Sequence, residues 1–296
     1  MFIPPKRTII LVTGSNGQLG REFRKWAVEN EAYEFLFTSR ASLDICTLPE
    51  VLTICTKWQP TYIINCAAYT AVDKAEENKI NAFAINEGGI SNLIKGAEIH
   101  NSTIFNYSTD YVYHSIIDRP ILEDDNCTPK GVYGQSKRAG EKLLEISDIA
   151  WINIRVSWLY SSYQNNFVKT MLHLGIEQDA LTIVSDQQGC PTYAANLASD
   201  TMKIIGSLEE SKTGLNEHYN YCNSGEINWA DFARLIFKLE NIACEVHNTT
   251  TEQYGAPAPR PFWSVMNTSK IRTTFNLGII PTIEKSLQSC LDLLKQ

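Results

Sequence analysis

Short apolar runs rich in β-branched residues recur along the first half of the chain and alternate with segments of helical periodicity. The first run, residues 8–13, is apolar throughout its centre and lacks the polar alternation of a strand exposed on one face. Such a run predicts a strand buried on both faces of a parallel sheet. Further strands are predicted at 34–39, 61–68, 102–108 and 151–156, with helices at 48–57 and 82–99. This alternation predicts an α/β fold with a doubly wound parallel sheet, whose ligands bind at the carboxyl ends of its strands.

The second half of the chain predicts a smaller C-terminal α/β domain that binds the substrate. Helices are expected at 167–174, 194–205, 229–239 and 283–294, and strands at 182–184 and 219–222. We expect residues 1–158 to form the sheet domain, with residues 190–222 returning to it. Residues 159–189 and 223–296 then form the substrate domain, and the substrate cleft is expected between the two domains.

A glycine-rich turn directly follows the first predicted strand. Its glycines are spaced G-x-x-G-x-x-G, and a helical pattern follows. Glycines let the backbone approach a ligand, and the free N–H groups and dipole of a helix N-terminus attract an anion. The turn therefore predicts a Rossmann-type dinucleotide site formed by Gly14, Asn16, Gly17, Gln18 and Leu19. An ordinary loop closed by glycines is the alternative.

Tyr133 and Lys137 stand four residues apart where a further helical pattern begins. This spacing puts both side chains on one face of a helix. A phenol has a reference pKa of about 10 and exchanges protons poorly at neutral pH unless a nearby cation favours its phenolate. Lys137 is placed to supply that cation, so the pair is a candidate for acid–base catalysis. A simple surface contact between helix neighbours is the alternative.

The glycine pattern, the Tyr133-x-x-x-Lys137 pair and Thr109 together resemble the extended branch of the short-chain dehydrogenase/reductase family. Within that branch, the chain is most similar to reductases of nucleotide-linked keto sugars, over nearly its whole length. The narrower resemblance rests on segments 65–76, 155–160, 165–172, 186–192 and 260–261. Five matching segments in the same order are more specific than any single motif.

The resemblance implies that Thr109, Tyr133 and Lys137 are catalytic. NADPH, with NADH also a possible donor, would deliver hydride to the C4 ketone of dTDP-4-dehydro-L-rhamnose in the last step of dTDP-L-rhamnose formation. Tyr133 would protonate the developing alkoxide, and Thr109 would hydrogen-bond the same oxygen. Lys137 would anchor the nicotinamide ribose and lower the pKa of the phenol, so that the proton moves at neutral pH.

The preference for NADPH is predicted from the end of the second strand. Folds that prefer NAD generally carry an acid there to bind the ribose 2′-hydroxyl, but this chain has Ser39 and Arg40. A guanidinium offers forked, charged donors to the oxygens of a 2′-phosphate. A solvated loop arginine is the alternative. The resemblance adds cofactor contacts from Asp44, Ile45, Ala67, Ala68 and Tyr69, although Asp44 could instead cap the helix beginning near Thr47.

The resemblance also implies which residues hold the substrate. Val72, Tyr111 and Trp158 would form an apolar and aromatic wall against the methyl-bearing face of a 6-deoxysugar, with core packing as the alternative role of the tryptophan. The diphosphate or thymine would be bound by Asn165, Asn166, Lys169, Gln188 and Arg260. The family pattern continues after Arg260 with a polar segment, whereas this chain has Phe262 to Met266, a departure that bears on substrate specificity.

Two other functions fit the same pattern. A catalytically silent regulatory subunit would keep the fold and the cofactor site without turnover, because a fold does not establish an activity. The presence of Thr109, Tyr133, Lys137 and Trp158 favours an enzyme. An epimerase or dehydratase of a nucleotide sugar is the other alternative. A dehydratase is expected to carry two acids after Thr109, and Asp110 supplies only the first.

Composition and charge narrow the remaining classes. The chain has 296 residues, of which 44% are apolar, and its net charge of −7 without a basic cluster argues against a nucleic-acid partner. Its eight cysteines show no C-x-x-C spacing, which predicts reduced thiols and no metal site. Residues 1–7 lack the apolar core of a signal peptide, and no apolar run approaches the ~20 residues of a membrane span. A cytoplasmic protein without membrane contact is expected, and the resemblance suggests a homodimer.

Overall fold

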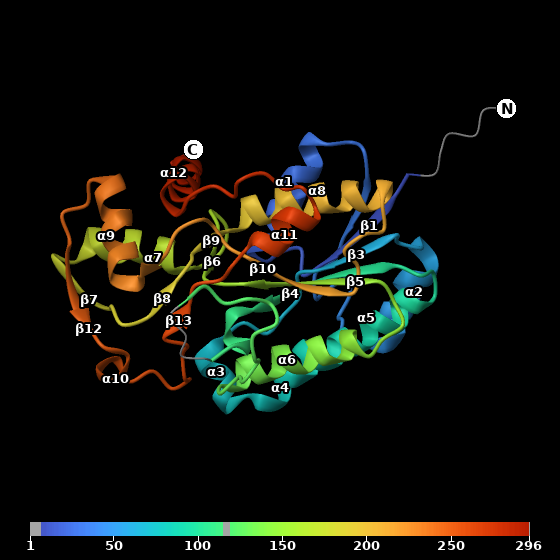
Figure 1. Cartoon of the computed structure of the whole chain (residues 1–296), viewed down its shortest axis with the longest axis horizontal. Helices are drawn as coiled ribbons and strands as arrows, with labels where there is room; N and C mark the ends of the chain where they lie inside the picture. Colours follow the sequence, from blue (N-terminus) through green and yellow to red (C-terminus); the bar gives the residue numbers. More distant parts are fainter. Residues whose placement is uncertain (1–6, 115–118, 296) are drawn as a thin grey trace.

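The computed structural model describes residues 7–114 and 119–295, and its centre is a parallel sheet of six strands (Figure 1). The strands are β1 (Ile9–Thr13), β2 (Glu34–Phe37), β3 (Tyr62–Asn65), β4 (Thr103–Thr109), β5 (Trp151–Val156) and β10 (Glu217–Tyr221). Their order is β10-β5-β4-β3-β1-β2, and every neighbouring pair is parallel. The chain therefore adds β2 on one side of β1 and the other strands on the opposite side, which confirms the predicted doubly wound α/β fold.

Helices cover both faces of this sheet, as the two layers in Figure 1 show. One face carries α1 (Gln18–Glu29), α8 (Ala194–Glu210) and α11 (Ser269–Thr274), and the other carries α2 (Leu48–Trp58), α5 (Gly89–Glu98) and α6 (Val132–Glu145). Along β1, Ile10 and Val12 pack in the first core, whereas Leu11 packs in the second. Because successive side chains of β1 enter different cores, residues 9–12 of the strand are all apolar.

The helix predicted at 82–99 begins earlier and is interrupted. After α3 (Val72–Glu77), the chain forms α4 (Lys79–Phe83), a π-helical turn η1 (Ala84–Gly88) and then α5. Asn86 lies in the π turn, where its amide accepts from the backbone N–H of Tyr69 at 2.9 Å and donates to Ser136 Oγ at 2.9 Å. This side chain ties the loop after β3 to helix α6, and both segments border the cleft described below.

The remaining elements build a second hydrophobic core, seen to the left in Figure 1. Its helices are α7 (Phe167–Glu177), α9 (Trp229–Glu240) and α12 (Ile283–Leu294), and α10 (Thr251–Tyr254) lies at its edge. Small sheets pair β7 (Ala180–Val184) with β12 (Glu245–Thr249), β6 (Leu159–Tyr160) with β9 (Thr192–Tyr193), and β8 (Gln188–Gly189) with β11 (Ile227–Asn228) and β13 (Trp263–Ser264). Phe232, Ile236 and Leu287 are fully buried there.

The packing differs from the sequence predictions at three points. Ile271 and Phe275, which were predicted to lie in the substrate domain, pack in the core of the large sheet because the chain crosses back over that face. The rest of the predicted division into two domains stays a prediction. Asp44 does not cap α2, since its carboxylate accepts from the backbone N–H of Cys46 instead. The strand predicted at 61–68 ends at Asn65, where the chain turns toward the ligand edge of the sheet.

Two predictions concern membranes and targeting. Across residues 7–114 and 119–295, none of the helices combines the length and apolarity needed to cross a bilayer. The prediction of no signal peptide falls mainly on residues 1–6, which lie outside the described residues.

Candidate active site

The glycine-rich turn joins β1 to α1 at the carboxyl edge of the sheet. Gly14 has a φ of 60°, and a Cβ there would lie 2.5 Å from the backbone nitrogen of Ala67. A Cβ on Gly20 would lie 2.5 Å from the Cα of Ser15. Gly17 at the N-cap offers no side-chain oxygen, and the first turn of α1 carries no acid. The turn therefore exposes helix N–H groups that suit an anion such as a pyrophosphate.

A cavity of about 450 Å³ lies beside this turn and reaches the end of β2. Nine predicted cofactor residues line it: Gly14, Asn16, Gly17, Ser39, Arg40, Asp44, Ile45, Ala67 and Ala68. The Arg40 side chain is 84% exposed, and its Nε lies 3.3 Å from Asp44 Oδ2. The backbone N–H of Cys46 and, to a lesser extent, Arg40 lower the pKa of Asp44. The rim of the cavity thus carries a guanidinium held by an ionised carboxylate.

A second cavity, of about 710 Å³, shares Gly17, Cys66 and Ala68 with the first. The two form one continuous cleft, which runs past Asn65, Thr109 and Val156 at the ends of β3, β4 and β5. Besides the shared Gly17 and Ala68, nine further residues of the predicted set line it: Gln18, Leu19, Val72, Thr109, Tyr111, Tyr133, Lys137, Trp158 and Asn165. The fold thus brings the three predicted catalytic residues into one cavity with the predicted sugar contacts.

The hydroxyls of Thr109 and Tyr133 meet inside this cleft. Thr109 ends β4, and its Oγ1 accepts from the backbone N–H of Tyr111 at 3.2 Å and donates to Asp110 Oδ1 at 3.1 Å. Tyr133 lies in the first turn of α6 and is hydrogen-bonded to Thr109. The ring of Tyr111 packs edge-on against that of Tyr133, with 5.5 Å between centroids. Two hydroxyl-bearing side chains, one at the end of β4 and one at the start of α6, therefore line the same cavity.

Burial controls the proton affinities of this group. It raises the pKa of Tyr133 to about 12, a rise that the hydrogen bond with Thr109 opposes. It also lowers the pKa of Lys137 to about 8, against the favourable charge of Glu141. The predicted net lowering of the phenol pKa is therefore wrong for this structure, because desolvation outweighs the other effects at Tyr133. At neutral pH Tyr133 is a neutral phenol, able to donate a proton.

Lys137 lies one turn after Tyr133 on α6, as the spacing predicted. Its side chain is buried, and its Nζ donates to the backbone carbonyl of Tyr107 in β4. It lines the cleft beside Cys66, close to the glycine-rich turn. The ammonium is thus held in the second cavity, near Cys66, which lines both cavities.

Five predicted contacts do not line either cavity: Tyr69, Asn166, Lys169, Gln188 and Arg260. The polar groups of several of them form hydrogen bonds within the protein. The Arg260 guanidinium binds Asp73 with two bonds of 3.0 and 2.8 Å and holds the pKa of Asp73 low. Asn166 caps α7 by accepting from the N–H of Lys169 at 3.2 Å, and its amide also donates to Gln18 at 3.0 Å.

Among the residues of the cleft that sequence reasoning missed are Gln164 and Trp229. Gln164 Nε2 donates to the carbonyl of Asn16 at 2.9 Å, which connects the loop after β6 to the glycine-rich turn. Trp229 begins α9 and stacks on Trp158, with 3.5 Å between ring centroids. Neither contact has a sequence signal, because its partners lie 148 and 71 positions apart and meet only through the fold.

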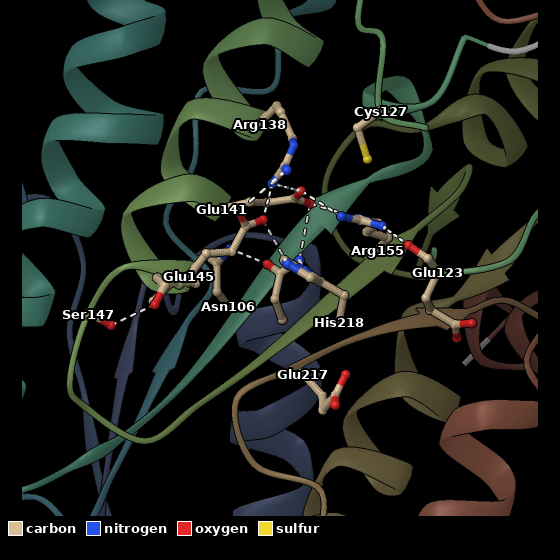
Figure 2. Close-up of polar contacts among 12 residues, drawn as sticks. Asn106, Glu123, Cys127, Arg138, Glu141, Glu145, Ser147, Arg155, Glu217 and His218 are labelled. Carbon is tan, nitrogen blue, oxygen red and sulfur yellow. Dashed lines mark hydrogen bonds and ion pairs between the residues drawn. The ribbon is translucent and has the colours of Figure 1, made fainter. Parts of the chain in front are cut away.

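The C-terminal half of α6 is anchored to the sheet by a buried polar network (Figure 2). Arg155 of β5 binds Glu141 of α6 with bonds of 3.0 and 2.9 Å, and both side chains are almost fully buried. Asn153 donates to Glu141 at 3.1 Å, and Asn106 donates to Asn153 at 2.7 Å. The helix that carries Tyr133 and Lys137 is thus fixed against β4 and β5 one turn beyond Lys137.

Within that network, Glu141, Glu145 and His218 place potential metal-ligand atoms within 4.8 Å of one another. Figure 2 shows Arg138 and Arg155 directed at the same carboxylates. His218 is hydrogen-bonded to Asn153 through Nδ1 and to Glu145 through Nε2. Because the arginines already compensate the acids, we assign this group a structural role and no metal.

Comparison with known proteins matches residues 8–296 to the family described as RmlD substrate binding domain. The chain is 39% identical over 280 residues to the dTDP-4-dehydrorhamnose reductase of Aggregatibacter actinomycetemcomitans, a match that covers 92% of this chain and 94% of that one.

Two solved structures are similar over nearly the whole chain. A dTDP-4-dehydrorhamnose reductase from Clostridium acetobutylicum superposes with a TM-score of 0.91 at 37% identity and covers 98% of this chain and 100% of its own. A dTDP-4-dehydrorhamnose reductase from Bacillus anthracis in complex with NADP superposes with a TM-score of 0.90 at 33% identity and covers 97% and 100%.

Proposed function

The chain belongs to the RmlD substrate binding domain family, and on that premise we propose that it reduces dTDP-4-dehydro-L-rhamnose to dTDP-L-rhamnose with NADPH. Relatives of this chain carry the name of that reductase, and one similar structure contains NADP. The observation that carries the proposal is the cleft in which Thr109, Tyr133 and Lys137 lie together, continuous with the cavity of Arg40. The reaction would be the last step of dTDP-L-rhamnose formation.

The cleft fits a dinucleotide in shape and in chemistry. The turn at Gly14 and Gly20 leaves no room for a Cβ, and the start of α1 presents uncapped N–H groups for the pyrophosphate. Arg40 would hold the 2′-phosphate at the outer end, and Lys137 would hold the nicotinamide ribose at the inner end. Bound NADPH would supply the hydride. The charge of Lys137 is retained at neutral pH because its lowered pKa of about 8 still lies above 7.

In this proposal, Tyr133 donates the proton that neutralises the new alkoxide at C4. Its pKa of about 12 keeps the phenol protonated until negative charge develops on the substrate oxygen. Thr109 would turn its hydroxyl proton from Asp110 Oδ1 to the same oxygen, while the backbone N–H of Tyr111 holds its Oγ1 in place. After the transfer, the ammonium of Lys137 nearby would stabilise the phenolate.

Val72, Tyr111 and Trp158 are proposed to bind the sugar. All three line the cavity, and they would present an apolar and aromatic surface to the face of the sugar that carries the methyl group. Asn165 would be the polar contact nearest to them for the rest of the nucleotide. We also propose a cytoplasmic location and a homodimer, and these two points rest on the sequence alone.

The experiment that tests the function is NADPH oxidation by the purified protein with enzymatically prepared dTDP-4-dehydro-L-rhamnose. Wild-type protein is expected to turn over, and Tyr133→Phe is expected to lose about 10²- to 10⁴-fold in kcat, the usual share of a general acid. NADPH binding, followed by fluorescence, should stay unchanged in Tyr133→Phe because the ring remains in place.

Tyr111→Phe is the matched control, since it removes a phenol hydroxyl from the neighbouring ring of the same cavity. It should retain most of the turnover. An active Tyr133→Phe enzyme would remove Tyr133 from its proposed role. Wild-type protein that binds NADPH tightly without turnover would favour the catalytically silent binding protein. Turnover of a different nucleotide-linked ketone would mean that this ketone, and not dTDP-4-dehydro-L-rhamnose, is the substrate.

A further inference from the structure

One wall of the cleft is the end of a column of aromatic rings. Trp158 and Trp229 both line the cavity, and their rings stack with 3.5 Å between centroids and 11° between planes. Behind Trp229 stands Phe167 at 4.5 Å, and Phe167 stacks in turn on Phe232 at 5.7 Å. Phe232 is buried in the second core beside Tyr160. The indole of Trp158 is therefore supported by a continuous series of ring contacts, stacked and tilted, that ends in the smaller core.

Trp158 is also confined from another direction. A Cβ added to Gly189 would lie 2.6 to 3.0 Å from the indole atoms Cε2, Cζ2 and Nε1 of Trp158, so the backbone of β8 packs directly against the ring. Trp158 has a φ of 47°, in the left-handed region that a bulky side chain rarely adopts. A backbone of this kind persists only where the surroundings hold it, and here Gly189 and Trp229 provide that confinement.

Trp229 is itself fixed by more than stacking. Its Nε1 donates to Gln187 Oε1 at 3.0 Å, and Gln187 Nε2 donates to Thr251 at 2.9 Å. It is the first residue of α9, where Asn228 caps the helix by accepting from the N–H of Asp231 at 2.8 Å. The ring that supports Trp158 thus comes from an element with its own anchors, on the far side of the cleft from the cofactor cavity.

We propose that Trp229 is a positioning residue of the sugar site, which holds the Trp158 indole at the angle and depth that the deoxysugar ring requires. The inference rests on the proposed function and goes beyond it, because it assigns the setting of the sugar to a residue of α9. Trp158 touches the sugar, and Trp229 acts through Trp158. A fixed indole orients the C4 carbonyl toward Tyr133, whereas a mobile one would admit the sugar in several poses.

The inference is tested first by removing the support. Trp229→Ala is expected to raise the KM for the dTDP-sugar about tenfold, the scale of one lost aromatic stack, and to lower kcat as misaligned poses accumulate. The KM for NADPH should not change, because Trp229 does not line the cofactor cavity. Trp229→Phe should restore most of the loss, since a phenyl ring can still stack on Trp158.

A second variant perturbs the same indole from its other side. Gly189→Ala adds only a methyl group, but that methyl would meet the Trp158 ring at 2.6 Å, and Trp229 blocks the retreat of the ring. It should raise the KM for the dTDP-sugar in the same direction without a change for NADPH. In the double variant with Trp229→Ala, the ring can move away, so the effect of Gly189→Ala should shrink.

The stack also has a spectroscopic signature. Two indoles at this distance couple, so the circular dichroism of the wild-type protein should contain an exciton couplet that is absent from Trp229→Ala and Trp229→Phe. Trp58→Ala is the matched control, because Trp58 ends α2 and lines neither cavity. It should keep both the couplet and the wild-type kinetics.

The outcomes separate this inference from the function on which it rests. Wild-type protein without turnover of the dTDP-sugar would refute the proposed function. An active wild type whose Trp229→Ala and Gly189→Ala variants keep an unchanged KM for the sugar would refute only the positioning role. A parallel rise in the KM for NADPH in both variants would also refute it, since it would indicate a general structural loss.

Discussion

The buried pair of Glu141 and Arg155 should decide whether helix α6, which carries Tyr133 and Lys137, stays in place against the sheet. Glu141 is fully buried and Arg155 is 2% exposed, and two bonds of 3.0 and 2.9 Å join them. Arg155 also donates to Tyr113 at 2.7 Å and to the carbonyl of Glu123 at 2.9 Å. Glu141→Gln keeps the shape of the side chain but leaves the Arg155 charge without its anion in the protein interior.

The expected cost follows from two independent lines. Burial raises the pKa of Glu141, but the charge and hydrogen bonds of Arg155 overcome it, so that the pKa falls from 4.5 to about 2. At about 1.36 kcal/mol per unit, this difference corresponds to roughly 3 kcal/mol in favour of the ionised form. Removal of one partner of a buried ion pair costs about 3–5 kcal/mol in general. We therefore expect Glu141→Gln to lower the free energy of unfolding by about 3 kcal/mol.

The assay is urea unfolding followed by circular dichroism between pH 7 and pH 2. Because the folded pKa of Glu141 lies below its unfolded value of 4.5, its contribution is complete above pH 4.5 and is lost as the pH falls toward 2. The gap in stability between wild type and Glu141→Gln should therefore be largest at neutral pH and close at low pH.

Glu217→Gln serves as the control. Glu217 pairs with Lys270 at 2.7 Å, as close as many buried pairs, but the two side chains are 49% and 33% exposed. A surface pair of this kind contributes about 0–1 kcal/mol. The reasoning would be refuted if Glu141→Gln cost no more than Glu217→Gln, or if its effect did not depend on pH.

Two further predictions concern the cofactor cavity. Gly20→Ala should prevent folding of the turn and abolish NADPH binding, because its Cβ would lie 2.5 Å from the Ser15 backbone. Gly88→Ala is the control: this position is also helical, but the nearest atom to an added Cβ lies at 3.9 Å, so NADPH binding should be normal. Equal NADPH binding by both variants would count against the packing argument. Arg40→Ala should raise the KM for NADPH about tenfold or more and leave that for NADH unchanged, since a charged hydrogen bond to phosphate contributes about 1.5–3 kcal/mol. A wild-type enzyme that prefers NADH would refute the role given to Arg40.

Local chemistry made the cofactor turn and the helix of Tyr133 predictable from the sequence. Gly14 and Gly20 mark the turn because any side chain there would collide with the backbone, and the apolar run of β1 marks a strand covered on both faces. The four-residue spacing of Tyr133 and Lys137 was sufficient to place both on one face of α6. Each of these signals depends on residues close together in the chain.

Contacts between distant segments were decided only by the tertiary structure. The guanidinium of Arg260 is used by Asp73, which lies 187 positions away, so a residue with the chemistry of a diphosphate ligand forms an internal ion pair instead. Asn166 is used as a helix cap, and Trp229 reaches the cleft only because α9 folds against the loop after β5. The pKa of Tyr133 likewise rises through burial, which no spacing of residues reveals.

The sequence by itself therefore determined the sheet, the glycine-rich turn and the helix of Tyr133, because backbone sterics and helical periodicity act over a few residues. The tertiary structure decided which polar groups remain free to meet a ligand and which aromatic rings form the wall of the cleft. Those outcomes depend on desolvation and on partners brought together by packing, and both are properties of the folded chain.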